Sequence, residues 1–200
     1  MRPRNKRMSA RLLMVDYDDS FTFMLVDLLR VAGAQVRVVR ASEISVGDAM
    51  ADDVDGIILS PGPGHPRDAP TAIAIAAACI SAGRPLLGIC LGHQAIALSG
   101  GGTIRRVRPV HGMSNAVNHH GAGLFAGLPA RFNATRYHSL AVDILPREFT
   151  ANAWSDDGTI MGFSHHTAPI HGLQFHPESI ASEYGPALVG AFVGVAEKGA

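Results

Sequence analysis

Residues 85–94 read Pro-Leu-Leu-Gly-Ile-Cys-Leu-Gly-His-Gln, an apolar strand pattern that runs through Gly-x-Cys-x-Gly into a helical pattern. This is the cysteine form of the nucleophile elbow, a tight strand-to-helix turn that presents a nucleophile at the edge of a sheet. We expect glycine at positions 88 and 92 because neighbouring backbone comes close there and a Cβ would clash. A helix N-terminus favours the thiolate, so Cys90 is the candidate nucleophile. A plain core cysteine is the alternative, but it gives the flanking glycines no purpose.

The rest of the first half alternates short apolar runs with helical patterns. This alternation predicts βαβ units and a mostly parallel sheet with right-handed crossovers. The expected strands lie at 11–15, 35–39, 56–59 and 84–89, and the expected helices at 21–32, 71–82 and 92–99. Beyond residue 103 the short runs punctuated by Gly, Pro, Asn and Asp predict antiparallel additions, with strands at 141–145, 150–154, 160–164 and 170–174 and a last helix at 185–195. We expect a single α/β domain over residues 11–200, preceded by a flexible basic tail at residues 1–10.

Composition excludes several classes of protein. With 47% apolar and 17% charged residues the chain is not expected to be disordered. Seventeen basic and 17 acidic residues give no overall field for nucleic acid or for an anionic membrane. Two cysteines do not make a secreted disulfide framework, and Cys79, in an alanine-rich helical pattern, is expected in the core. No apolar run has the length of a membrane span and no secretory signal is recognised, which favours the cytoplasm.

A second loop is expected beside the elbow. Ser60-Pro61-Gly62-Pro63-Gly64 follows the predicted strand at 56–59, and ligands of open α/β sheets bind at the carboxyl ends of the strands. Its N–H groups are candidates for a ligand site, together with the N–H of Leu91 as an oxyanion donor. The segment lacks the Gly-Lys-Ser/Thr ending of a phosphate loop. The alternative is that it is only a turn.

Among ten histidines, His176 is the candidate base. Gln174-Phe175-His176-Pro177-Glu178 places a carboxylate two residues after the imidazole, on the same side if the segment is extended. Pro177 restricts both its own φ and the residue before it. A carboxylate beside an imidazole sets the tautomer and stabilises the imidazolium, so Glu178 is the candidate orienting group.

The other histidines are weaker candidates. His119-His120 and His165-His166 are adjacent pairs in stretches expected to be polar loops, without a cysteine or carboxylate at ligand spacing. A zinc site is therefore not expected. His93 is expected to pack at the start of its helix, and His138 to line the pocket.

These motifs resemble those of the class I, or triad-type, glutamine amidotransferases, and within them the small subunits of anthranilate synthase and aminodeoxychorismate synthase. The resemblance covers about residues 12–192. The cysteine elbow and the His-Pro-Glu segment are specific to the triad class. Two further segments indicate the chorismate-utilising branch, namely Asp19-Ser20-Phe21-Thr22 and Arg136-Tyr137-His138-Ser139-Leu140.

The resemblance implies a flavodoxin-like fold and a role for each matched position. Cys90 would attack the side-chain amide of L-glutamine and form a γ-glutamyl thioester, while His176 moves the proton and Glu178 orients it. The N–H groups of Gly62 and Leu91 would form the oxyanion hole. The residues implied in glutamine binding are Gly62, Pro63, Gly64, Gln94, Ser139 and Leu140.

The resemblance also implies a partner, a larger chorismate-binding synthase subunit that would hold Mg²⁺, so that this chain needs no metal or cofactor. The family's usual Asp-Asn-Tyr-Asp-Ser-Phe opening is here Asp16-Tyr-Asp-Asp-Ser-Phe21, Met24 stands where asparagine is common, and Met113 replaces a lysine. These departures leave the partner open. Ser182-Glu183 favours aminodeoxychorismate as the product over anthranilate. The alternatives are a triad-class enzyme of another pathway, a peptidase or γ-glutamyl hydrolase, and a regulatory subunit without catalysis.

Overall fold

The computed structural model describes residues 9–51 and 53–199, and within them the strands form one mixed sheet in the order β2-β1-β3-β4-β9-β8-β7-β5-β6. Strands β2, β1, β3, β4 and β9 pair in parallel, and the remaining pairings are antiparallel. The strands span β1 Arg11–Asp16, β2 Gln35–Arg40, β3 Gly56–Leu59, β4 Leu86–Ile89, β5 Thr103–His119, β6 Arg131–Ile144, β7 Phe149–Ser155, β8 Ile160–His165 and β9 Ile170–Leu173. The expected parallel core is confirmed, and the antiparallel strands continue the same sheet.

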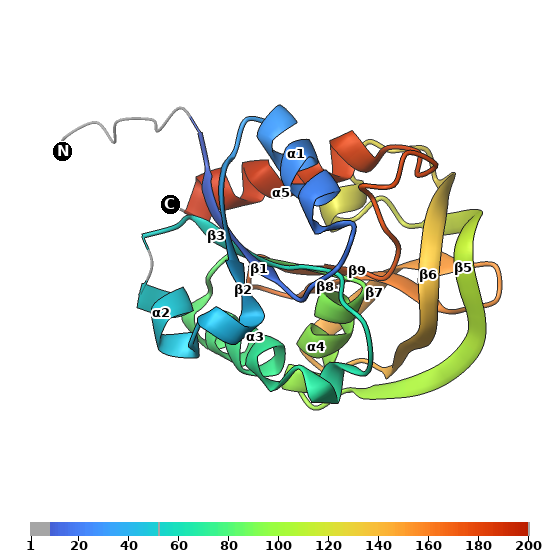
Figure 1. Ribbon diagram of the computed structural model, residues 1–200. Helices are drawn as coiled ribbons and strands as arrows, with labels where there is room; N and C mark the ends of the chain where they lie inside the picture. The colour runs from blue at the N-terminus through green and yellow to red at the C-terminus, as the bar shows by residue number, and fades with distance from the viewer. Residues whose placement is uncertain (1–8, 52, 200) are drawn as a thin grey trace.

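Helices cover both faces of the parallel part (Figure 1). On one face lie α1 (Thr22–Val31) and α5 (Gly185–Gly199), and on the other α2 (Val46–Ala51), α3 (Pro70–Ala82) and α4 (Leu91–Ser99). Successive β1 residues alternate between the two cores, because side chains of a strand point to opposite faces. Leu12 packs in the cluster of α1 and α5, and Leu13 packs in the cluster of α3 and α4. Burial on both faces explains why these strands read as continuous apolar runs.

The order of the parallel strands determines where a ligand can bind. The chain passes from β1 to β2 on one side and then to β3 on the other, so the carboxyl ends of β1 and β3 flank a topological switch point. The segments after β3, β4 and β9 all leave from this same edge of the sheet. They carry the Ser60–Gly64 loop, Cys90 and His176 respectively.

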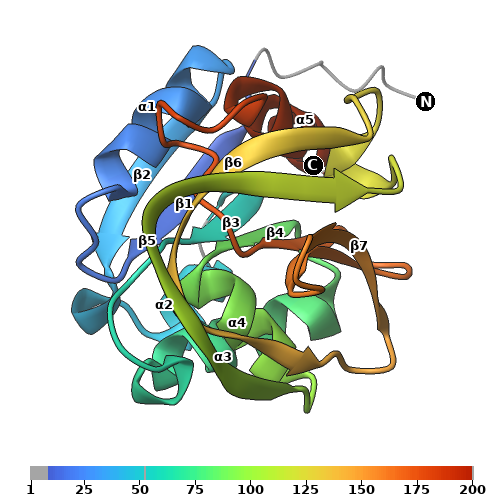
Figure 2. The ribbon, with the colours of Figure 1, turned by 90° about the vertical axis from the view of Figure 1, so that its right-hand side faces the viewer.

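The long β5–β6 ladder was not predicted in full. Only the end of β6 matched an expected strand, at residues 141–145, and all of β5 was missed. β5 contains Pro109 and Gly112, and its pairing with β6 shifts register between Arg106 and Val110 and again between His111 and Met113. Such bulges bend a strand, and in Figure 2 both strands curve across the open end of the parallel sheet. The apolar pattern of the sequence is therefore interrupted here because the two strands are bent, and the strands are held by hydrogen bonds to each other.

The ends of the predicted domain differ slightly from the structure. Residues 1–8 of the predicted basic tail lie outside the described residues. Ala10, its last residue, is buried and accepts a hydrogen bond from the N–H of Gln35 at 2.8 Å, so it belongs to the packed domain. The short helix α2 and three 3-10 turns, Ala41–Glu43, Pro66–Asp68 and Gly123–Phe125, were not predicted. Across the described ranges, every helix is too short or too polar to cross a membrane.

Candidate active site

The turn between β4 and α4 has the geometry of a nucleophile elbow. Cys90 lies between Ile89, the last residue of β4, and Leu91, the first of α4, with φ 50° and ψ −98°. A positive φ is strained for a residue with a Cβ and is maintained only when the surroundings enforce it. A Cβ on Gly88 would lie 2.4 Å from the carbonyl carbon of Gly92, and a Cβ on Gly92 would lie 2.3 Å from the carbonyl oxygen of Leu59. The expected close approach of backbone is thus confirmed.

Cys90 opens onto a cavity of about 210 Å³ that the expected ligand-binding segments surround. The Ser60–Gly64 loop forms one wall, α4 another, and the middle of the β5–β6 ladder covers the third. The lining residues are Gly62, Pro63, Gly64, Cys90, Leu91, Gln94, His111, Tyr137, His138, Ser139 and Leu140. The six residues expected to bind glutamine are all among them. His111 of β5 and Tyr137 of β6 also line the cavity and were not among the expected site residues.

The residues of the two expected oxyanion donors, Gly62 and Leu91, both line this cavity and lie side by side. Leu91 is at the first position of α4, where an N–H has no acceptor within its own helix. Gly62 packs directly against it, since a Cβ on Gly62 would stand 2.5 Å from Cδ2 of Leu91. The loop is anchored by Ser60, whose Oγ accepts from the N–H of Tyr17 at 2.9 Å. The segment is therefore more than a connecting turn, because its glycines are part of the cavity wall.

His176 and Glu178 form a buried pair behind Cys90. Nδ1 of His176 is 2.6 Å from Oε1 of Glu178, and the two side chains are 2% and 0% exposed. The expected extended geometry of this segment was wrong in detail. His176 pairs with Thr135 of β6 in a single antiparallel bridge, and the chain then turns, with the N–H of Ser179 donating to the His176 carbonyl. The turn, rather than the two-residue period of a strand, brings the carboxylate onto the imidazole.

The electrostatics of His176 tie it to Cys90. Burial alone lowers the pKa of an imidazole, but hydrogen bonding and charge from Cys90 and Glu178 together raise the pKa of His176 well above its ordinary value. Nε2 of His176 is buried and has no hydrogen bond within strict geometric limits among the described residues. Its electrostatic partner is the Cys90 sulfur, and the raised pKa favours the protonated form of the imidazole.

Two aromatic rings hold the imidazole in place. Phe21, just before α1, meets His176 edge-on with ring centroids 5.1 Å apart, and Tyr137 of β6 does so at 5.3 Å. Phe21 and Tyr137 also contact each other, at 4.9 Å. The Asp-Ser-Phe-Thr and Arg-Tyr-His-Ser-Leu segments, distant in sequence, therefore meet at the candidate base.

A chain of hydrogen bonds runs along the cavity floor to Cys90. Nε2 of Gln94 donates to the carbonyl of Leu140 at 2.9 Å and to Oε1 of Gln174 at 3.0 Å. Nε2 of Gln174 in turn donates to Sγ of Cys90 at 3.7 Å. Gln174 is fully buried, and no motif in the sequence gave it a role, although it stands two residues before His176.

His93 and the paired histidines of the sequence pack or form hydrogen bonds within the fold. His93 is buried and packs on Phe163 with ring centroids 4.4 Å apart, as expected. The expectation of loops for the paired histidines was wrong, because His119 ends β5 and His165 ends β8. His119 is buried, with Nε2 2.6 Å from the carbonyl oxygen of Pro129. In the part of the chain that the structure describes, no three His, Cys, Asp or Glu side chains are grouped to hold a metal ion.

Comparison with known proteins agrees with this geometry. Residues 13–195 match the family described as glutamine amidotransferase class-I. The chain is 45% identical over 185 residues to anthranilate synthase component 2 of Azospirillum brasilense, covering 91% of this chain and 94% of that one. It is 44% identical over 191 residues to aminodeoxychorismate synthase of Streptomyces griseus, covering 94% of this chain and 26% of that longer protein.

A solved structure supports the same assignment of the fold. A crystal structure from Thermoplasma acidophilum, described as that of a GMP synthase subunit, superposes with a TM-score of 0.85 at 28% identity. The superposition covers 95% of both chains. The similarity therefore extends over nearly the whole chain.

Proposed function

The chain belongs to the class I glutamine amidotransferase family, and from that membership we propose that it hydrolyses L-glutamine with Cys90, His176 and Glu178 as a catalytic triad. The observation that carries the proposal is the buried His176–Glu178 pair beside the Cys90 elbow, in which contacts with the Cys90 sulfur and with Glu178 raise the pKa of His176. The ammonia released would serve a larger chorismate-converting synthase, either an aminodeoxychorismate synthase or an anthranilate synthase.

The geometry supports the following steps. The Cys90 thiolate attacks the side-chain carbonyl carbon of glutamine, and the oxyanion that forms is stabilised by the N–H groups of Gly62 and Leu91. The imidazolium of His176 gives its proton to the leaving nitrogen, which departs as ammonia and leaves a γ-glutamyl thioester. His176 then takes a proton from water, which attacks the thioester and releases glutamate and the thiolate. Glu178 keeps the tautomer and orientation of the ring throughout.

The cavity suits the substrate. Both N–H groups of the Gln94 side chain are occupied by Leu140 and Gln174, which leaves the carbonyl oxygen of Gln94 as an acceptor at the cavity wall. An acceptor is what an ammonium group such as the α-amino group of glutamine requires. The backbone of the 62–64 loop and of Ser139 and Leu140 would complete the contacts with the amino acid. No cofactor takes part in these steps, and Mg²⁺ would belong to the partner.

An apolar surface beside the site supports a protein partner. Phe23 and Met24 of α1 are 62% and 42% exposed, Met113 of β5 is 58% exposed, and Ile180 is 99% exposed. The segments that carry these residues adjoin, because Phe21 contacts Tyr137 and the hydroxyl of Ser114 donates to the carbonyl of Ala181 at 3.3 Å. Exposed apolar patches of this kind typically mark interfaces. The altered residues Met24 and Met113 thus occupy the surface on which the synthase would dock.

The relatives support both candidate products, because proteins named for aminodeoxychorismate and for anthranilate match at similar identity. Ser182 and Glu183, which favoured aminodeoxychorismate in the sequence, bind to β6. The hydroxyl of Ser182 accepts from the N–H of Thr135 at 2.9 Å, and Glu183 accepts from the N–H of Asn133 at 2.6 Å. They position the loop after Glu178, a role that either product allows. The second candidate function, ammonia supply to another pathway, rests on the similarity to the GMP synthase protein.

The test is the Cys90→Ala variant, assayed with the partner synthase obtained by co-purification from the native cell. Glutamine-dependent product formation is expected to disappear, while ammonia-dependent formation by the same complex persists. Glutamine hydrolysis retained by Cys90→Ala would refute the assignment of the nucleophile. Chorismate conversion by the co-purified partner tests the destination of the ammonia separately, and a partner that acts on another substrate would refute the chorismate branch.

A further inference from the structure

Gln174 is the first residue after β9, and its side chain reaches the sulfur of Cys90. The side-chain nitrogen lies 3.7 Å from Sγ, within the range of an N–H···S hydrogen bond, and the residue is fully buried. Its backbone N–H donates to the carbonyl of Met161 in β8 at 2.9 Å, which holds it beside the sheet. A buried amide that faces a thiolate can stabilise it only if the nitrogen, and not the oxygen, points at the sulfur.

The direction of the Gln174 amide follows from its neighbours. The carbonyl of Leu140 is only an acceptor, so Gln94 must present its nitrogen to it. The second N–H of that nitrogen then points to Gln174, whose side-chain oxygen must accept the hydrogen bond. The nitrogen of Gln174 is left facing Cys90. Although the two ends of an amide look alike, an acceptor-only carbonyl at one end of the chain sets the direction of every bond in it.

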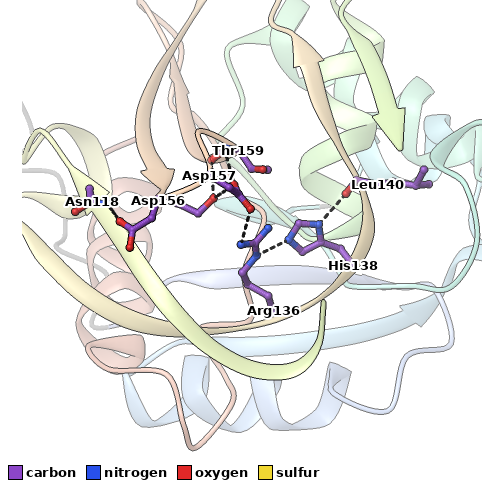
Figure 3. A network of polar contacts seen from close by, with 8 residues as sticks. Asn118, Arg136, His138, Leu140, Asp156, Asp157 and Thr159 are labelled. Atoms are coloured by element: carbon purple, nitrogen blue, oxygen red, sulfur yellow. Dashed lines mark hydrogen bonds and ion pairs between the residues drawn. The ribbon is translucent and has the colours of Figure 1, made fainter. Parts of the chain in front are cut away.

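Arg136 and His138 of β6 hold the Leu140 carbonyl. Nδ1 of His138 lies 2.9 Å from that carbonyl oxygen, and Nε2 of His138 accepts from Nε of Arg136 at 3.0 Å (Figure 3). The guanidinium is only a donor, so His138 carries its proton on Nδ1 and donates it to Leu140. Burial first, and then the charge of Arg136, lower the pKa of His138 to about 4, which keeps the ring neutral. Asp157, in the turn between β7 and β8, pairs with Arg136 at 3.4 Å.

We propose that Gln174 stabilises the thiolate of Cys90 by donating its side-chain N–H to the sulfur. The Arg136–His138 pair holds in place the Leu140 carbonyl, the acceptor that sets the direction of this bond through Gln94. Gln174 therefore contacts the reacting atom, whereas Arg136 and His138 are positioning residues. The inference rests on the proposed function, in which Cys90 is the nucleophile.

The charged groups that act on Cys90 come from two sides. His176, paired with Glu178, supplies a positive charge from the segment after β9. Arg136 acts from β6 through its chain of hydrogen bonds. Gln174 adds a neutral donor between them, so its replacement leaves both ion pairs in place.

The experiment measures alkylation of Cys90 by iodoacetamide, followed by mass spectrometry of the whole chain, because this reagent needs no amino-acid recognition. Gln174→Met keeps the length of the side chain and removes the donor. At about pH 7 the rate of Cys90 alkylation in this variant is expected to be roughly threefold to tenfold lower than in the unaltered chain, which corresponds to the free energy of one neutral hydrogen bond. At about pH 9.5, where an ordinary thiol ionises unaided, the two rates are expected to agree within about twofold. Gln174→Glu presents a carboxylate oxygen to the sulfur and is expected to be slower than Gln174→Met at about pH 7.

The positioning residues have their own variant. His138→Phe removes the bond to the Leu140 carbonyl without touching Cys90. It is expected to slow alkylation at about pH 7 in the same direction as Gln174→Met, by roughly twofold to fivefold, and to recover at about pH 9.5. A uniform loss at both pH values would indicate a merely structural effect and would overturn the role of the Arg136–His138 pair.

The matched control is Gln35→Glu, the same chemical change at an exposed position of β2, which is expected to react like the unaltered chain. Cys79, fully buried, serves as an internal standard that stays unlabelled in every folded variant. If Gln174→Met reacts as fast as the unaltered chain at about pH 7, the role of Gln174 is refuted.

Failure of the proposed function is measured independently. The unaltered chain is treated with 6-diazo-5-oxo-L-norleucine, a diazoketone analogue of glutamine. Saturable labelling of Cys90 is expected from a glutamine site. Labelling that does not saturate would contradict the proposed function while leaving the iodoacetamide comparison intact.

Discussion

Replacement of Cys90 first by alanine and then by glycine measures the strain stored in the elbow. At φ 50° and ψ −98° an alanine retains the unfavourable conformation of the cysteine, whereas a glycine does not. The difference in stability between Cys90→Ala and Cys90→Gly therefore reports the conformational strain of the backbone, since both variants lack the sulfur. The matched control is Ala95→Gly, the same change at a fully buried position in the regular part of α4.

The expected magnitudes follow from these surroundings. Loss of a buried methyl group destabilises by about 0.8 kcal/mol, and the greater freedom of glycine in the unfolded chain costs about 0.5–1 kcal/mol. At position 95 these effects add to a loss of roughly 1.3–1.8 kcal/mol. At position 90 relief of strain returns about 1–3 kcal/mol. Alanine-to-glycine exchange at the elbow should thus be close to neutral, between a loss of about 0.8 and a gain of about 1.7 kcal/mol.

The assay is equilibrium unfolding in urea at constant pH, with each midpoint compared at an unchanged slope. The free energy of unfolding of Cys90→Gly minus that of Cys90→Ala is compared with the loss caused by Ala95→Gly. A difference of about 1–3 kcal/mol between the two sites is expected, in favour of glycine at position 90. Equal losses at both positions would mean that the elbow is not strained, and the argument that the fold enforces the geometry of Cys90 would be wrong.

Three further predictions concern the base, the glycines and the buried histidines. His176→Asn should slow formation of the thioester by ~10²–10⁴-fold in single-turnover experiments, because general base catalysis contributes that much; an unchanged rate would exclude His176 as the base. Gly88→Ala should destabilise the fold by about 1–3 kcal/mol or more, since the added Cβ would meet backbone. Gly190→Ala, which has open space around it in α5, should instead stabilise the fold by about 0.5–1 kcal/mol. Equal thermal midpoints for the two variants would contradict the close packing at Gly88. Burial lowers the pKa of His138 and of His171 to about 4. As the pH falls, these histidines therefore take up protons in the unfolded chain before they do so in the folded chain, and the free energy of unfolding should be about 2 kcal/mol lower per histidine at pH 5 than above about pH 6.5. Urea midpoints that stay constant from pH 7 to pH 5 would show that these rings are not buried as neutral bases.

Much of the parallel half could be predicted from the sequence because its signals are local. The strand at residues 56–59 was predicted with its observed bounds, and the helix expected at 71–82 ends at Ala82 as predicted, followed by Gly83 in the left-handed conformation. The β5–β6 ladder could not be predicted in the same way. Its exposed residues and its bulges around Pro109 leave no continuous apolar period, and its paired residues lie 13 to 41 positions apart in the sequence. Its strands are stabilised by each other, and a pairing partner cannot be identified from a local pattern.

The same distinction applies to the site. The sequence by itself determined the elbow, because Gly-x-Cys-x-Gly between a strand and a helix permits few backbone conformations, and it determined the candidates Cys90, His176 and Glu178. Only the tertiary structure decided how they meet: β9 inserts beside β4, and the bridge between Thr135 and His176 sets the imidazole behind the sulfur. The tertiary structure alone also revealed Gln174, since its role depends on the direction of hydrogen bonds from Leu140 and Gln94. Local steric constraints depend on adjacent residues, whereas the direction of a buried amide depends on groups that the fold brings together.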